Sequence, residues 1–270
     1  MGFQLIVPIQ DPDDSRLEAY RHVRERDLVG RRGRFIAEGR IVLSILLGSK
    51  DYDLESALML DLRIDHNANL LAKIPEDVPI YVVSQQVMDA VAGFNVHRGV
   101  LAIGRRMQSP KIGDLISTAS EDCLVTVLSG ISNHDNVGSI FRNAAAFSAH
   151  AVLLDELCCH PLYRKALRVS VGGVLKVPWT MGGSVNQILG EMAAQGFLVA
   201  ALSPSGSLPI KDLPTTGKRA LLLGSEGHGL PEQLLDTLQT YKIPMSVAFD
   251  SLNVATASGI AMFASSRYSQ

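Results

Sequence analysis

Four short, almost continuous apolar runs in the second half of the chain constrain its fold more than any other feature. They are LVTVL, AVLLD, FLVAAL and ALLLG, beginning at Leu124, Ala151, Phe197 and Ala220, and helix-patterned segments separate them. Runs of this kind are typical of strands covered on both faces, and parallel strands need long crossover connections between them. The sequence therefore predicts an α/β domain built on a parallel sheet.

The connecting segments carry helical patterns. In NVGSIFRNAAAF the apolar residues recur at i, i+3, i+4 and i+7, namely at Val137, Ile140, Phe141 and Ala144. A proline opens a second helix in PEQLLDTLQ. The last pattern, roughly from Asn253 to Tyr268, is rich in Ala, Ser and Gly. Residues this small allow backbones to approach closely, so we expect this helix to pack against another element or another subunit.

The first part of the chain predicts a small α/β domain of its own. It holds an apolar helix candidate (IAEGRIVLSILLGS), strand candidates in ESALML, PIYVVS and GVLAIG, and a short helix in QQVMDAVAG. The segment RMQSPKIGDLISTASED mixes Pro, Gly, Ser and charge, which is typical of a connector with one short helix at most. We therefore predict a domain at 1–107, a linker at 108–121 and a second domain at 122–270.

Composition limits the classes of protein to consider. The first dozen residues lack the basic start of a signal peptide, and no apolar run approaches the roughly 18 residues that span a bilayer. The odd set Cys123, Cys158 and Cys159 indicates reduced thiols. Cys158 and Cys159 precede His160, but no second cluster completes a metal site, so a buried structural role is favoured. We expect a cytoplasmic protein with no membrane partner and no metal.

The charge distribution hints at nucleic acid, although the formal net charge is only −2. Seven arginines stand against three acids between Arg21 and Arg40. In VGRRGRF, forked donors and a glycine that lets the backbone come close both suit phosphate contact. A solvated helix face with ion pairs explains the same charges equally well. The RNA-binding candidates are Arg31, Arg32, Arg34 and, in a later loop, Arg98.

Three polar, glycine-bearing segments follow predicted strands of the second domain. They are SGISNHDNVGSIFRNAA after LVTVL, GSEGHGLP after ALLL, and IPMSVAFDSLNVATASG after a further short strand that we expect to end at Tyr241 or Lys242. In open α/β sheets, ligands bind beyond the carboxyl ends of the strands. None of the three fits a common nucleotide-binding or nucleophile motif. Taken singly, each has a plain explanation as a helix cap or a tight turn. Glu226, however, stands between turning glycines, whose exposed N–H groups suit the polar parts of a ligand.

The three segments together resemble a known family. N-x-G-x-x-x-R begins at Asn136, G-S-E-G-x-G-L begins at Gly224, and I-P-M with S-L-N-V lies between Ile243 and Val254. In this order they are similar to the three signature motifs of the SpoU-like (TrmH-type) RNA ribose methyltransferases of the SPOUT class. RVSVGGVLKVP resembles the family's intermediate region, and residues from about 25 to 106 resemble the RNA-binding domain that precedes it in many members. The departures at Val247, Ala248, Ala255 and Thr256 would change loop shape but remove no reactive group.

The resemblance implies a deep trefoil knot near the C-terminus, a homodimer whose interface includes the knot, S-adenosyl-L-methionine as the cofactor and RNA as the partner. By motif match, the cofactor-binding residues would be Gly224, Ser225, Glu226, Gly227, Gly229, Ile243, Met245, Leu252 and Asn253.

Arg142 matches the family's catalytic arginine. Because arginine is normally protonated, we assign it mainly to fixing a phosphate and polarising the hydroxyl rather than to taking a proton. The residues that would orient Arg142 and the ribose are Asn136, Glu226, Ser251 and Asn253. We expect the three turns to converge into one pocket with Arg142 at its mouth.

These inferences predict a methyltransferase acting on an RNA ribose 2′-hydroxyl. Ribosomal RNA is favoured over tRNA because the first domain resembles the ribosome-directed branch. A nucleotide-dependent oxidoreductase or hydrolase would need a phosphate-binding loop after its first strand, and none is visible. A non-catalytic RNA-binding protein with the same fold would leave no reason for Arg142, Glu226 and Asn253 to occur together.

Overall fold

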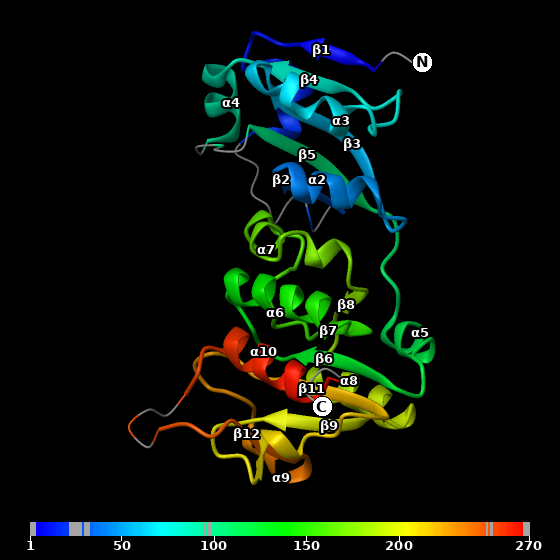
Figure 1. Ribbon diagram of the computed structural model, residues 1–270, viewed down its shortest axis with the longest axis vertical. Helices are drawn as coiled ribbons and strands as arrows, with labels where there is room; N and C mark the ends of the chain where they lie inside the picture. Colours follow the sequence, from blue (N-terminus) through cyan, green and yellow to red (C-terminus); the bar gives the residue numbers. More distant parts are fainter. Residues whose placement is uncertain are drawn as a thin grey trace. The chain divides into compact units, whose positions relative to one another are not determined.

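The chain divides into two compact units in the computed structural model, which describes residues 4–21, 29, 33–93, 96, 99–246, 248 and 251–266 (Figure 1). The first unit comprises Met1–Gln108 and Leu162–Leu175, and the second comprises Ser109–Pro161 and Lys176–Gln270. These boundaries differ from the predicted ones. The expected linker belongs to the second unit and carries helix α5 (Ile112–Ser117), while Leu162–Leu175, expected in the second domain, belongs to the first unit.

The first unit is built on a mixed sheet with the strand order β1-β4-β3-β5-β2. The pairs of β4 with β1 and with β3 are parallel, and the pairs of β5 with β2 and with β3 are antiparallel. The strands are β1 (Ile6–Pro8), β2 (Arg34–Glu38), β3 (Tyr52–Leu60), β4 (Ile80–Val83) and β5 (Val100–Arg106). The helices are η1 (Ser15–Tyr20), α2 (Arg40–Leu47), η2 (Asp61–Arg63), η3 (Asp65–Asn67), α3 (Ala68–Leu71), α4 (Gln85–Ala92), α7 (Arg164–Val169) and η4 (Gly173–Leu175).

The helix predicted from Ile36 begins later than expected. Residues 34–38 form strand β2, and α2 starts only after Gly39, whose φ of 91° turns the chain. A left-handed φ of this kind favours glycine and interrupts a regular element. Short apolar runs fit a buried strand and a buried helix equally well, so periodicity alone could not separate the two.

A buried ion pair holds α7 in the first unit. The Glu38 carboxylate is 4% exposed and accepts a hydrogen bond from Arg164 Nη1 at 2.5 Å, with Arg168 Nη1 at 4.0 Å. The Tyr52 hydroxyl also donates to the Val174 carbonyl at 3.4 Å. These contacts explain why a segment between two strands of the second unit is a structural part of the first.

Where the second unit is described, it holds a sheet of seven parallel strands in the order β10-β12-β9-β11-β6-β7-β8. The predicted α/β fold with a parallel sheet is confirmed, and β6 is buried along its whole length. The short strands β8 and β10 and helix α8 were not predicted. The strands are β6 (Cys123–Leu128), β7 (Ala151–Leu154), β8 (Trp179–Met181), β9 (Leu198–Leu202), β10 (Leu208–Pro209), β11 (Lys218–Leu223) and β12 (Gln239–Lys242).

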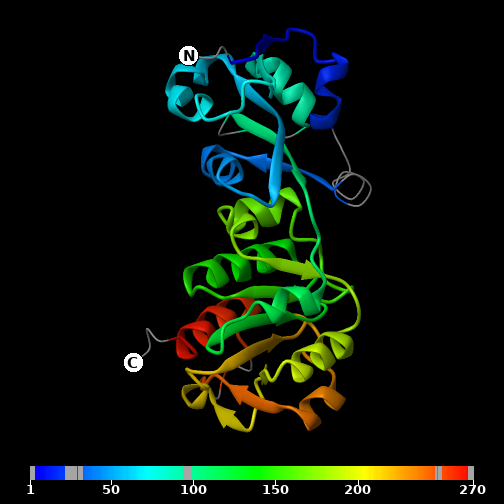
Figure 2. The same ribbon diagram turned by 90° about the vertical axis from the view of Figure 1, so that its right-hand side faces the viewer.

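Helices cover both faces of this sheet (Figure 2). One face carries α6 (His134–Ala146) and α10 (Val254–Ala264), which pack against each other. The apolar stripe predicted for α6 is fully buried. The other face carries α5, α8 (Val185–Ala194) and α9 (Glu232–Thr237) around a shared apolar core, and η5 (Ile210–Asp212) follows β10. Across the described residues, no helix is both long enough and apolar enough to cross a membrane.

A glycine in β5 offers a test of packing in the first unit. A Cβ atom added at Gly104 would overlap the ring of Phe35, a side chain that is itself 1% exposed. We expect Gly104→Ala to lower the free energy of unfolding by about 1–3 kcal/mol, because the buried Phe35 ring would have to shift within the core to make room. Urea denaturation measures this. The matched control is Gly190→Ala in α8, where no atom lies within 4 Å of the added carbon and where helix propensity predicts equal or higher stability.

Candidate active site

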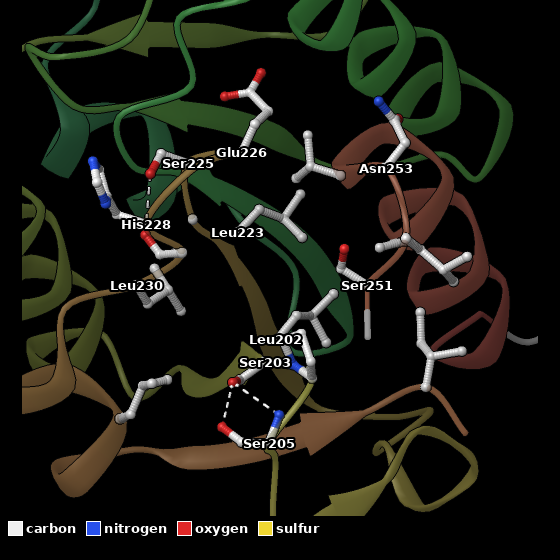
Figure 3. Close-up of a pocket in the computed structure, with 18 of the residues that line it drawn as sticks. Leu202, Ser203, Ser205, Leu223, Ser225, Glu226, His228, Leu230, Ser251 and Asn253 are labelled. Atoms are coloured by element: carbon white, nitrogen blue, oxygen red, sulfur yellow. Dashed lines mark hydrogen bonds between the residues drawn. The ribbon is translucent and has the colours of Figure 1, made fainter. Parts of the chain in front are cut away.

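A cavity of about 610 Å³ lies beyond the carboxyl ends of β9, β11 and β12 (Figure 3). Its walls come from the turns after those strands and from the segment that leads into α10. Glu226 and Asn253 lie towards one side of it and Ser203 and Ser205 towards the opposite side. The cavity is lined, among others, by all the residues expected to bind the cofactor and by Ser251: Gly224, Ser225, Glu226, Gly227, Gly229, Ile243, Met245, Ser251, Leu252 and Asn253.

The turn after β11 depends on two glycines. A Cβ at Gly224 would lie 2.5 Å from the Gly229 carbonyl carbon, so the two backbones can approach only without a side chain there. Gly229 has a φ of +67° and donates its N–H to the Ser225 carbonyl at 3.0 Å. The chain thus doubles back on itself and presents Glu226 and His228 at the tip of the turn.

Three side chains from distant segments form one hydrogen-bonded chain beside the cavity. Asn253 Oδ1 accepts from the backbone N–H groups of Ala255 and Thr256, at 2.9 and 3.3 Å, and so caps α10. Its Nδ2 then donates to Asn136 Oδ1 at 2.9 Å, and Asn136 Nδ2 donates to Glu226 Oε1 at 2.7 Å. Since an amide accepts with oxygen and donates with nitrogen, the cap at α10 fixes the direction of the whole chain.

Arg142 does not occupy the expected position. It lies on an exposed part of α6, and it is not among the residues that line the cavity. Within the described part of the chain, its guanidinium forms no hydrogen bond or ion pair. The structure therefore brings Asn136, Glu226 and Asn253 together and leaves Arg142 outside the group.

Two further polar residues position the site and were not predicted. Asn143 Nδ2 donates to the Ala255 carbonyl and to Ser258 Oγ, both at 2.9 Å, which ties α6 to α10. Asp155, 1% exposed, follows β7 and accepts from Ser129 Oγ at 2.8 Å and from the Gly130 N–H at 3.0 Å. The sequence does carry a signal for Asp155, because its carboxylate directly follows the apolar run AVLL of a predicted buried strand.

The turn after β9 also contributes to the cavity, through residues 202–205. The sequence predicted this strand, but the polar SPSG that follows it was given no role. Because β9 lies between β11 and β12, its carboxyl end had to meet theirs. The role of this turn thus follows from the strand order, and the sequence alone does not give that order.

The two neighbouring cysteines carry thiols that ionise poorly. Burial, together with the nearby negative charge of Glu226, raises the pKa of the Cys159 thiol to about 12. Burial likewise raises the pKa of Cys158, whose Sγ donates to the Leu128 carbonyl at 3.4 Å. Both thiols therefore stay protonated near neutral pH.

Of the arginines proposed for RNA contact, only Arg34 falls within the described residues. Its Nε lies 2.6 Å from Glu55 Oε2, so its charge is already compensated inside the first unit. Arg31, Arg32 and Arg98 lie outside the described residues.

Comparison with known proteins identifies the class of this site. The family description SpoU rRNA Methylase matches residues 123–263, which contain the cavity and the hydrogen-bonded chain. An uncharacterised tRNA/rRNA methyltransferase of Mycobacterium bovis is 38% identical over 97% of this chain and 92% of its own length. The chain therefore belongs to the SpoU family of RNA methyltransferases.

Solved structures share the fold along nearly the whole chain. An rRNA methyltransferase from Sinorhizobium meliloti, determined with bound AdoMet, superposes with a TM-score of 0.83 at 21% identity and covers 98% of both chains. An RNA 2′-O ribose methyltransferase superposes with a TM-score of 0.79 at 22% identity, covering 96% of this chain and 98% of its own.

The hydrogen-bonded chain generates a stability prediction. Asn253→Ala removes both the cap of α10 and the contact with Asn136, so we expect the free energy of unfolding to fall by about 1–2 kcal/mol. Asn253→Ser keeps a capping oxygen but is too short to reach Asn136, and it should recover part of this loss. Chemical denaturation of both variants, and of each combined with Asn136→Ala, measures the coupling. Strictly additive effects would contradict a direct interaction between the two asparagines.

Proposed function

We propose that this protein transfers a methyl group from S-adenosyl-L-methionine to a ribose 2′-hydroxyl of RNA, with ribosomal RNA as the favoured substrate. The observation that carries the proposal is the convergence of three separate turns on one cavity, with the chain Asn253–Asn136–Glu226 at its side. The family description names rRNA, and one of the structural neighbours acts on the ribose 2′-oxygen.

The cavity fits the proposed cofactor in size and charge. Its volume lies in the range of small-molecule sites. Leu202, Ile243 and Met245 supply apolar surface, and the glycine turn supplies backbone polar groups. Among the described residues that line it, none is Lys or Arg, while Glu226 and Glu232 bring negative charge. Such a lining suits a cation and not the phosphates of a dinucleotide. When bound, the cofactor would supply a methyl group carried by positively charged sulfur.

Glu226 and the two asparagines would hold the ribose. The Asn136 amide fixes one carboxylate oxygen of Glu226, which leaves its remaining acceptor sites for hydroxyl groups of the substrate. Holding a hydroxyl within about 3–3.5 Å of the carbon it attacks is an orientation effect that removes much of the barrier. Ser251 lines the same cavity and would add a further hydrogen-bonding group.

A homodimer would bring Arg142 to the site. Arg142 lies away from the cavity of its own chain, and α10 exposes Ile260 and Phe263 to 37% and 49% beside the α6–α10 contact. Phe147 at the end of α6 packs edge-on against Phe263 at 6.1 Å. We propose that two copies associate through α6 and α10, so that Arg142 of one protomer completes the cavity of the other.

We also propose a deep trefoil knot near the C-terminus. Strand β12, the last in the sequence, pairs between β9 and β10 rather than at a sheet edge, which supports threading of the chain in this region.

The proposed activity is tested by incubating the protein with methyl-labelled cofactor and total RNA and mapping the modified nucleotide. Methylation of a ribose 2′-oxygen in ribosomal RNA is the expected result. Label in tRNA alone would overturn the rRNA assignment. Calorimetry with S-adenosyl-L-methionine that shows no heat of binding would favour a non-catalytic RNA-binding protein.

Arg142→Ala should abolish methyl transfer while the cofactor affinity stays within a few-fold of wild type. Arg142→Lys should not rescue the activity, because lysine lacks the planar fork that binds phosphate in two places. Lys211→Ala, an exposed cation in the same unit, is the control and should remain active. Full activity of the lysine variant would show that the fork is not needed.

Mixing two inactive variants tests the shared site. A heterodimer of Arg142→Ala with Glu226→Ala contains one intact site if the arginine comes from the partner protomer, and none if it acts within its own chain. With random exchange, half of the dimers are mixed and each regains one of two sites, so we expect about a quarter of the wild-type activity. No recovery, with exchange verified by mass spectrometry, would contradict the proposed dimer geometry.

The salt dependence of RNA binding tests the arginine segment. The logarithm of the RNA association constant falls linearly with the logarithm of the salt concentration. Replacing Arg31 and Arg32 by alanine should make this fall less steep, by roughly 0.7–0.9 for each phosphate that the variant no longer binds. Arg34→Ala should change the slope less, because Glu55 already pairs with that cation. Filter-binding titrations from low to moderate salt measure both, and an unchanged slope in the double variant would exclude phosphate binding by this segment.

A further inference from the structure

A second hollow of about 540 Å³ adjoins the cavity on the other side of the glycine turn. Its walls are Gly130, Ser132 and Asn133 from the loop after β6, Leu157 from the loop after β7, and the turn Ser225–His228. That turn also lines the first cavity, so Glu226 borders both spaces. A molecule in the hollow would therefore lie directly beside the proposed methyl donor.

The chemistry of the hollow suits a neutral group with hydrogen-bonding edges. Among the described residues that line it, none is Lys or Arg, which leaves a phosphate without a counter-charge. Asn133 Oδ1 accepts from the Asp135 N–H at 2.8 Å and caps α6, so its amide nitrogen remains available as a donor. Ser132 adds an exposed hydroxyl, and Glu226 adds acceptors from the opposite wall.

An apolar side chain stands at the rim of the hollow. Leu157 is 71% exposed, yet its backbone is fixed, because its N–H donates to the buried Asp155 carboxylate at 3.1 Å. The same carboxylate oxygen accepts from the Gly130 N–H on the other wall at 3.0 Å. Asp155 thus holds both walls at a set separation, and it presents Leu157 to solvent in a defined place.

We infer that this hollow holds the base of the nucleotide to be methylated. Leu157 packs on the face of the base, as apolar side chains do on unstacked bases, while Asn133 and Glu226 bind its edge. The ribose attached to that base then lies at Glu226, where the two spaces meet. This inference rests on the proposed function, and it adds the residues that recognise the base.

The test compares three variants on the RNA that the wild-type protein methylates. Leu157→Ala should raise the KM for RNA about tenfold, with the cofactor affinity and the melting temperature unchanged. Leu157→Met keeps an apolar face and should stay within about twofold of wild type. Asn133→Ser keeps a capping oxygen for α6 but loses the amide donor, and it should also raise KM and relax the choice of base at the modified position.

Leu198→Ala, which truncates a partly exposed leucine at the amino end of β9, is the matched control and should not change KM. Unchanged KM and unchanged base preference in both Leu157→Ala and Asn133→Ser, with the wild type active on a ribose, would overturn the base site while leaving the proposed function intact. A wild-type protein that binds the cofactor but transfers no methyl group would instead overturn the proposed function.

Discussion

The site depends on the direction of two amide groups. Asn253 must turn its oxygen towards the N-terminus of α10, because the backbone N–H groups there have no other partner within the helix. Its nitrogen then faces Asn136, and the nitrogen of Asn136 in turn faces Glu226. The residue that caps α10 therefore also fixes the position of the Glu226 carboxylate, through Asn136. Glu226 and Asn136 lie far apart in the sequence.

The sheet makes this chain of hydrogen bonds possible. With β9 between β11 and β12, the turns that follow these strands emerge together at one edge. Helices α6 and α10 pack on one face of the sheet and are joined by Asn143. The bonds from Asn253 to Asn136 and from Asn136 to Glu226 then hold the amino ends of both helices near the turn after β11. Small residues in α10 permit this approach: a Cβ at Gly259 would lie only 3.2 Å from Asn143 Nδ2.

The sequence predicted the parallel sheet and the part of the cavity lining that comes from the turn after β11 and from the segment before α10, because both depend on local patterns: unbroken apolar runs and turns rich in glycine and asparagine. It did not predict features that depend on tertiary partners. The assignment of Leu162–Leu175 to the first unit follows from the burial of Glu38 against Arg164. The position of Arg142 follows from the face of α6 on which it lies, and a motif match carries no information about what that face contacts.

Charge is divided between the parts of this molecule in a way that matches the proposed reaction. The two spaces beside the glycine turn have no lysine or arginine among their described lining residues, whereas Arg142 is exposed and makes no ion pair with the described residues. A cationic methyl donor and a neutral base would both be disfavoured by a guanidinium inside their pockets, and a phosphate would be disfavoured by Glu226. If Arg142 comes from the surface of a second protomer, the phosphate can bind to it while the methyl donor and the base lie in pockets without a guanidinium. The site would then become complete for RNA only when two chains meet.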